Sequence, residues 1–199
     1  MADKQKAEVI ATAVLSGKEN ITKLIENLDN SSRRVRQMSA SAIEYIAREE
    51  PEMVIPFWDD LFDALDRSEA QTRWEILDTF TTLIPFYGEK SEKILLDAEN
   101  ALFDEDSGPL RLAGMCFICT LGATDKERSV KVWPLIDEAI QCYHGDIEFG
   151  DMLLAVTTFA EGDIAEEVKE ELADRMMFDA KNGKGALKCR AEIIVEALK

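Results

Sequence analysis

A two-helix pattern recurs in this sequence about every 37 or 38 residues. In each copy an apolar segment ends in an aspartate, a short polar turn follows, and a second apolar segment opens with a basic residue. A single helix pair of this size cannot bury its own apolar face, so such repeats stack on one another in a row. The aspartates and basic residues of the copies are Asp29 and Arg36, Asp66 and Arg73, Asp104 and Arg111, and, less regularly, Asp179 and Lys188.

Apolar residues within the copies follow the spacing of helices that are buried on one side. In the second copy, Val54, Phe57, Trp58 and Leu61 recur every three or four residues, which places them on one helical face. No stretch alternates apolar and polar residues with a period of two, so we expect almost no β-sheet. The sequence therefore predicts an all-α fold, a right-handed α-solenoid of about five helix pairs, preceded by a capping helix over residues 5–16.

Two prolines and the recurring polar residues resemble a known repeat. Pro56 and Pro134 stand two periods apart and fall near the expected starts of first helices, where a proline costs little because early N–H groups lack an intrahelical acceptor. With the aspartate at the turn and the Val-Arg pair that opens a second helix, the pattern resembles HEAT repeats of the armadillo-like helical class over roughly residues 19–199. Since the sequence contains no obvious linker, we expect one HEAT-like repeat domain over residues 1–199.

Composition restricts the partners that this chain can have. Forty acidic residues against 23 basic ones give a formal net charge of −17, which disfavours nucleic acids and anionic membrane surfaces. A basic protein segment would be attracted, although acidity also serves solubility alone. No apolar run reaches the roughly 18 residues that a membrane span requires, and no secretory signal is recognisable. We expect a cytoplasmic protein whose four cysteines remain reduced.

The recurring aspartates and basic residues could be mistaken for catalytic groups, but we interpret them as structural. Each aspartate would accept hydrogen bonds from N–H groups of its turn and from the next basic residue, which satisfies donors at the start of the second helix. The residues of this expected ladder are Asp29, Arg36, Asp66, Arg73, Asp104 and Arg111.

Other reactive side chains form no recognisable site. Cys116 and Cys119 make a Cys-x-x-Cys pair inside an apolar helix, whereas zinc needs about four ligands. His144 is the only histidine and lies on an expected turn, with no nucleophile motif beside it. The sequence therefore predicts no metal and no cofactor.

One segment suggests an enzymatic alternative. Trp74 and Asp78 lie four residues apart, on one face of an expected helix, in a stretch similar to the Trp-Asp-x-x-Asp of AlkD-type DNA glycosylases, which are built from HEAT-like repeats. The resemblance implies that these two residues and Arg111 would line a site for a damaged nucleotide. That family needs a basic concave surface, whereas this chain has acidic residues on or near its second helices. These are Glu44, Glu75, Asp78, Glu148 and Asp151.

Three functions are compatible with these observations. The first is a non-catalytic scaffold that binds a protein partner, with a basic segment on its concave face, through Glu75, Asp78 and Asp151. The second is an alkylation-repair glycosylase that acts through Asp78, Trp74 and Arg111, or an inactive relative of it. The third is a structural role as a subunit, because the apolar last helix leaves a homo-oligomer open. The acidic charge favours the first function.

Overall fold

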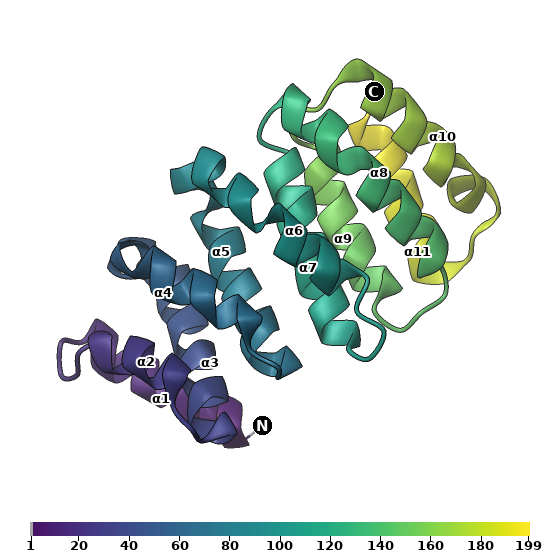
Figure 1. The fold of residues 1–199 in the computed structure, drawn as a ribbon. Coiled ribbons are helices and arrows are strands. Elements are labelled where there is room, and N and C mark those ends of the chain that lie inside the picture. The colour runs from purple at the N-terminus through teal and green to yellow at the C-terminus, as the bar shows by residue number, and fades with distance from the viewer. Residues whose placement is uncertain (1) are drawn as a thin grey trace. The chain divides into compact units, whose positions relative to one another are not determined.

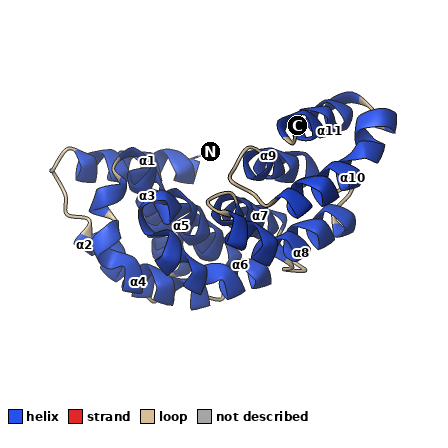
Figure 2. Ribbon diagram, turned by 90° about the horizontal axis from the view of Figure 1, so that it is seen from above, coloured by secondary structure: helices blue, strands red, loops and turns tan. Residues whose placement is uncertain are grey.

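The computed structural model describes residues 2–199, and this part of the chain consists of helices and turns without a β-strand (Figures 1 and 2). It forms two compact units, Met1–Tyr87 and Gly88–Lys199. The expectation of an all-α fold is therefore confirmed. The expectation of one domain over residues 1–199 stays a prediction.

The first unit contains a capping helix and two helix pairs. Helix α1 (Ala2–Leu15) packs against α3 (Arg33–Glu49), as expected for a helix that covers the end of a stack. The first pair joins α2 (Thr22–Glu26) and the 3-10 turn η1 (Asn27–Asp29) to α3. The second pair consists of η2 (Pro51–Met53), η3 (Ile55–Phe57), α4 (Trp58–Asp63) and η4 (Ala64–Asp66), followed by α5 (Ala70–Ser91). Helix α5 is kinked at Tyr87, with φ −144° and ψ 48°, and the first unit ends at this residue.

A proline after α3 and an aromatic contact between α4 and α5 shape the second helix pair of the first unit. Helix α3 ends at Glu49, because Pro51 disfavours helical torsion angles in the residue before it, and Glu50 has φ −142° and ψ 72°. Trp58 at the start of α4 is 4% exposed, and its ring centroid lies 4.7 Å from that of Phe80 in α5. Aromatic packing of this kind joins the two helices of the second pair.

The second unit contains three helix pairs. Helix α7 (Gly108–Gly122) packs against α6 (Leu95–Leu102) and α8 (Lys126–Cys142). It also packs against α9 (Phe149–Ala160), which in turn packs against α11 (Gly185–Ala197) (Figure 1). The second helices of successive pairs therefore lie side by side, as in a solenoid. The other elements are η5 (Glu92–Ile94) and α10 (Glu166–Asn182), which packs against α11.

The two prolines of the sequence pattern have different positions. Pro56 lies in η3, directly before α4, as expected. Pro134 lies in the middle of α8, so the prediction that it marks the start of a helix was wrong. The start of α8 is set by Asp125, whose side chain accepts a hydrogen bond from the backbone N–H of Arg128 at 2.9 Å. An N-terminal cap of this kind satisfies a donor that the helix leaves unpaired.

Candidate functional site

A cavity of about 480 Å³ lies in the first unit, lined by α1, α3 and α5. Three of its lining residues, Trp74, Glu75 and Asp78, come from α5 and are half-buried. Positions separated by three or four residues share one face of a helix, so the i, i+1, i+4 spacing of these residues turns them toward the same side. The cavity therefore contains both the aromatic and the acidic residues that the sequence singled out in this helix.

The opposite wall of the cavity comes from one face of α3. Ser41, Tyr45 and Arg48 follow one another at intervals of four and three residues and all line it. The other face of α3 carries Ile43 and Ile46, which are fully buried in the core. Burial of the apolar face therefore orients the polar face of α3 toward the cavity.

Two sets of contacts order the side chains of the cavity. The hydroxyl of Ser41 donates to Oε1 of Glu75 at 2.6 Å, which connects α3 to α5. Arg48 pairs with Glu44, with Nε 2.6 Å from Oε1 and Nη2 2.9 Å from Oε2. The Arg48 guanidinium carbon also lies 5.6 Å from the ring centroid of Tyr45, within the range of a cation–π contact.

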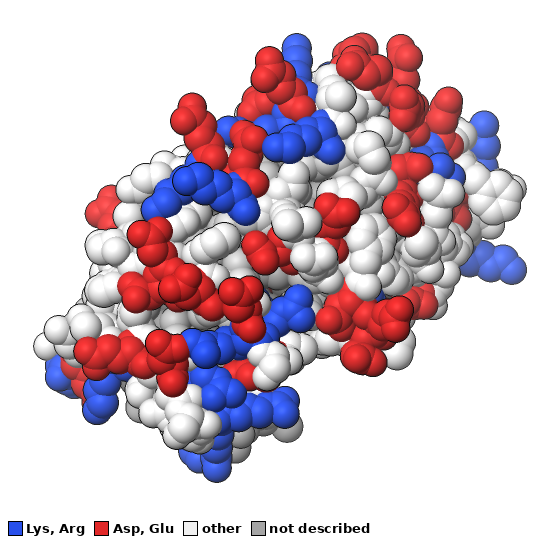
Figure 3. Space-filling view, in the orientation of Figure 1, with Lys and Arg blue, Asp and Glu red and all other residues white. Residues whose placement is uncertain are grey.

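The charge of the cavity lining is predominantly negative. Figure 3 shows acidic side chains interspersed with basic ones over the face that it draws. In the cavity the carboxylates outnumber the guanidinium groups, so its field favours a cation over an anion. The charged residues of the lining are Glu8, Glu44, Glu75, Asp78, Arg34 and Arg48.

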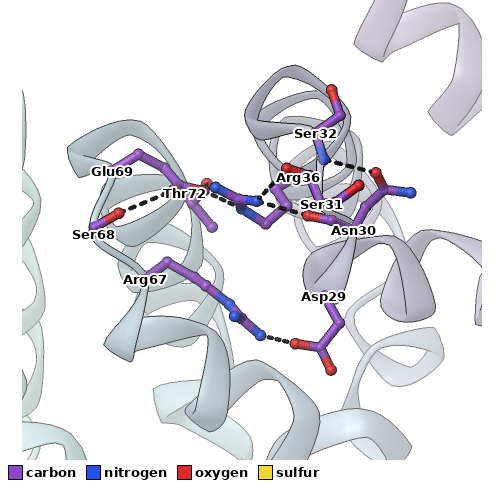
Figure 4. A network of polar contacts seen from close by, with 9 residues as sticks. All are labelled: Asp29, Asn30, Ser31, Ser32, Arg36, Arg67, Ser68, Glu69 and Thr72. Carbon is purple, nitrogen blue, oxygen red and sulfur yellow. Dashed lines mark hydrogen bonds and ion pairs between the residues drawn. The ribbon is translucent and has the colours of Figure 1, made fainter.

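The residues of the expected ladder in the first copy find partners in the second copy (Figure 4). Arg36 donates through Nε and Nη2 to the two carboxylate oxygens of Glu69, at 2.5 and 2.9 Å, and through Nη1 to the backbone carbonyl of Asn30 at 2.6 Å. Asp29 pairs with Arg67. The hydrogen bonds from Arg36 hold the pKa of Glu69 at about 2, well below its usual value.

In the third copy the arginine side chain binds the backbone carbonyl of the aspartate. Asp104 accepts hydrogen bonds through Oδ1 from the N–H groups of Asp106 at 3.0 Å and Ser107 at 2.9 Å. Arg111 donates to the backbone carbonyl of Asp104 at 3.0 Å, and its guanidinium carbon lies 5.1 Å from the ring centroid of Tyr143. Burial raises the pKa of Tyr143 above its ordinary value, and the Arg111 charge opposes this. Arg111 thus binds residues of its own unit, where these contacts connect a turn to a neighbouring helix.

The remaining residues of the expected sites are dispersed. Asp66 is exposed in η4, and Arg73 is half-buried near the start of α5. Asp151 belongs to α9 of the second unit, where its side chain is 64% exposed and Oδ1 lies 3.7 Å from Nη2 of Arg190. Trp74 and Asp78 thus line one cavity, while Arg111 and Asp151 are part of the second unit.

The fourth, less regular aspartate of the pattern has another role. Asp179 is buried inside α10, and Nε2 of His144 lies 3.2 Å from each of its carboxylate oxygens. Nζ of Lys188 instead lies 3.9 Å from Oε1 of Glu192 in the same helix. Asp179 therefore connects α10 to the turn before α9 and does not mark a turn of its own.

Within residues 2–199 no group of three or more His, Cys, Asp or Glu side chains is arranged to hold a metal ion. No disulfide joins the four cysteines, all of which lie in the described part of the chain. None of the helices that the structure describes combines the length and the apolar composition needed to cross a bilayer.

Three residues of the cavity lining, Ser41, Tyr45 and Arg48, are not among the site residues expected from the sequence. The repeat period contained a usable signal, because positions 37 residues before Trp74 and Asp78 are Gln37 and Ser41, and both line the cavity. Equivalent positions of successive second helices face the same side of a stack. Tyr45 and Arg48 lie across the cavity from Trp74 and Asp78, and this position depends on how α3 packs against α5.

Comparison with known proteins establishes the fold. No protein-family model matches the sequence, and no curated protein matches it. Solved structures do match. A designed armadillo repeat protein in complex with the peptide (KR)4 matches with a TM-score of 0.74 at 16% identity, over 100% of this chain and 90% of that chain. The fold is an armadillo-like helical repeat.

Two further structures agree with this armadillo-like fold. An engineered protein matches with a TM-score of 0.76 at 14% identity, over 100% of this chain and 90% of that chain. A computationally designed armadillo repeat protein for modular peptide recognition matches with a TM-score of 0.73 at 15% identity, over 100% and 91%. The expected HEAT-like, armadillo-like class is thus confirmed as a fold. The resemblance to AlkD-type glycosylases is not shown by these structures.

Proposed function

We propose that this protein is a non-catalytic repeat scaffold that binds a basic segment of a protein partner in the cavity of its first unit. The observation that carries the proposal is that Trp74, Glu75 and Asp78 line one cavity with a negative excess of charged groups. Repeat folds of this kind serve many functions, so the proposal depends on the site and not on the fold.

The chemistry of the cavity suits a lysine or arginine side chain. The carboxylates of Glu75 and Asp78 can pair with its charge, and the half-buried indole of Trp74 offers an aromatic face for a cation–π contact of about 0.5–1 kcal/mol. Charge complementarity of this type acts mainly on association rate and specificity. Several such contacts along a peptide are therefore needed for useful affinity.

The structural neighbours support a peptide as the partner. One designed armadillo repeat protein of this fold is in complex with the peptide (KR)4, and another is described as made for modular peptide recognition. Asp151, 64% exposed in the second unit, is a further acidic position that we assign to the binding of a basic segment. We also place the protein in the cytoplasm, where its cysteines would remain reduced.

The direct test is fluorescence anisotropy with a labelled eight-residue peptide of alternating lysine and arginine, the composition of (KR)4. The double variant Glu75→Gln, Asp78→Asn should weaken binding by about tenfold, since two charge-assisted contacts are lost. Affinity should fall as salt rises from 50 to 300 mM, because exposed charges are screened over roughly 8 Å at physiological ionic strength.

A matched control separates the cavity from the acidity of the whole chain. Asp60→Asn, Asp63→Asn removes the same charge from exposed positions of α4 in the same unit. This control should bind the peptide like the wild type. An equal loss of affinity in both double variants would show a general attraction to an acidic protein and would refute the assigned site.

The glycosylase alternative rests on the fact that Trp74 and Asp78 line the same cavity. Incubation with alkylated duplex DNA at low salt decides it: release of a modified base that is lost in Asp78→Asn would establish the enzyme. If the protein does not shift duplex DNA in a gel at low salt, the glycosylase alternative is excluded. Light scattering of the purified chain tests the remaining possibility, a homo-oligomer.

A further inference from the structure

A second cavity, of about 690 Å³, lies along α1 in the first unit. It adjoins the first cavity, that of Trp74 and Asp78, because Glu8 of α1 and Tyr45 of α3 line both. A peptide that fills the first cavity can therefore continue into the second one past this shared wall.

One face of α1 forms a wall of the second cavity. Val9, Thr12 and Ala13, with Ser16 directly after the helix, follow the i, i+3, i+4, i+7 spacing of a single helical face. The opposite face of α1 is buried in the core, and its residues are Ala7, Ala11 and Val14. Burial of that face therefore leaves the face of Val9 to the solvent.

The second cavity differs from the first in charge. Its charged lining residues are one acid, Glu8, and one base, Lys18, so their charges cancel. The hydroxyls of Thr12 and Ser16 already donate to backbone carbonyls, that of Glu8 at 2.7 Å and that of Ala13 at 3.1 Å. These two donors are therefore directed at the chain itself and not at a ligand.

An apolar side chain fits the second cavity better than a charged one. Val9 is 70% exposed and Ala13 is half-buried, so both have apolar surface in contact with water. Covering such surface is favourable in proportion to its area. A charged side chain would lose hydration there and would find no excess of opposite charge.

We propose that the second cavity receives an apolar side chain of the same segment whose lysine or arginine enters the first cavity. This inference rests on the proposed function, because it assumes that a basic segment binds there. In an extended peptide, side chains two residues apart point to the same side, about 7 Å from each other. The recognised motif is therefore a basic residue and an apolar residue two positions apart.

The test compares two labelled nonapeptides by fluorescence anisotropy. The leucine probe is Lys-Lys-Leu-Ala-Arg-Ala-Leu-Lys-Lys, in which a leucine stands two positions away on each side of the arginine, so the chain direction does not matter. The alanine probe has alanine in place of both leucines. The wild type should bind the leucine probe about fivefold more tightly, because one leucine becomes partly buried. Equal affinities would overturn the proposal.

Val9→Ser tests whether this advantage arises in the second cavity. The advantage should fall to about twofold or less, while the affinity for the alanine probe stays the same. Val9→Ile should keep the advantage, because it preserves the apolar surface. Since Val9 is exposed, both variants should unfold like the wild type. An undiminished advantage in Val9→Ser would overturn the proposal.

Leu96→Ser is the matched control, because Leu96 is 66% exposed and belongs to α6 of the second unit. It should leave the advantage of the leucine probe unchanged. An equal loss in this variant and in Val9→Ser would reduce the effect to general hydrophobic adsorption. Light scattering excludes another occupant: a dimer of the wild type that becomes a monomer in Val9→Ser would place a second copy on this cavity and overturn the proposal.

Failure of this inference is distinct from failure of the proposed function. If Glu75→Gln, Asp78→Asn loses both probes but the wild type binds them equally well, the first cavity binds a basic segment and the role of the second one is refuted. If the wild type binds neither probe, the proposed function falls and this inference with it.

Discussion

Arg36 and Glu69 are joined by two parallel hydrogen bonds between guanidinium and carboxylate, and they belong to successive helix pairs. Glu69 is only 5% exposed and also accepts a hydrogen bond from the hydroxyl of Thr72 at 3.1 Å. Arg36 reaches back at the same time to the carbonyl of Asn30. One arginine thus connects the turn of the first pair to the start of the second helix in the next pair.

The Arg36–Glu69 pair should make folding stability depend on pH. The pKa of Glu69 is held at about 2 in the folded protein, so its ionised form stabilises the fold above about pH 4.5, and this contribution is lost as the pH falls toward 2. With solvent screening, the carboxylate should contribute about 2 kcal/mol at neutral pH. Urea unfolding of the wild type and Glu69→Gln should show a stability difference that shrinks between pH 5 and pH 2.

Asp66→Asn provides the comparison for this pH dependence, because Asp66 is an exposed acid three residues before Glu69. Its unfolding free energy should follow that of the wild type at every pH. A Glu69→Gln curve that runs parallel to the wild type from pH 7 to pH 2 would contradict the assignment.

Gly114 should not tolerate a side chain. A Cβ there would lie 2.6 Å from the backbone nitrogen of Leu102 and 2.7 Å from the carbonyl oxygen of Ala98, so α6 and α7 would have to separate. Gly114→Ala should lower the free energy of unfolding by about 1–3 kcal/mol, as overpacked cores do. Chemical denaturation measures the loss.

Gly150→Ala is the counterpart of Gly114→Ala. The added Cβ would meet the end of the flexible Arg190 side chain, which can move aside. Since alanine favours helix over glycine by about 1 kcal/mol, this variant should be neutral or slightly stabilising. Similar destabilisation in both glycine variants would argue against the close contact of α6 and α7.

The four cysteines should differ in reactivity with a disulfide reagent such as DTNB. Cys142 and Cys189 are exposed and should react rapidly in the folded protein, whereas Cys116 is half-buried and should react more slowly. Burial raises the pKa of Cys119, so its thiol should react only after unfolding. Cys142→Ser, Cys189→Ser should abolish the fast phase, and a fast phase that survives would contradict the predicted burial.

Trp74 should report on the cavity by fluorescence. Trp58 and Trp133 are only 4% and 7% exposed, so acrylamide should quench mainly the half-buried Trp74. Bound peptide should protect this residue. Trp74→Phe should remove most of the quenching and lower affinity for the basic peptide by about threefold, through loss of aromatic area. Trp133→Phe should keep the protection from acrylamide that bound peptide gives. If this variant loses the protection, the peptide binds outside the cavity.

Much of the fold could be predicted from the sequence pattern. The apolar spacing and the break before Pro51 act within a few residues of the chain and indicate helices and their ends. The period of 37 or 38 residues indicates that pairs of such helices stack. The error at Pro134 has a local reason as well. A proline is permitted near a helix start, but the capping aspartate Asp125 decides where α8 begins.

The partners of the polar residues could not be predicted in the same way. Asp29 and Arg36 are close in sequence, yet their carboxylate and guanidinium groups contact Arg67 and Glu69 of the following pair. Several acids and bases of similar spacing compete for each partner in an acidic chain. Which of them meet depends on the packing of one helix pair on the next.

The amino-acid sequence alone determined that helices pair and repeat, and it determined the negative charge, since both follow from residue types at regular intervals. It also placed Trp74 and Asp78 on one helical face. The repeat period points to Ser41 as well, but only the folded chain brings that face opposite Tyr45 and Arg48 around a cavity. The physical reason is that this pairing is a contact between helices distant in sequence, decided by the packing of α3 and α5 and by no local signal.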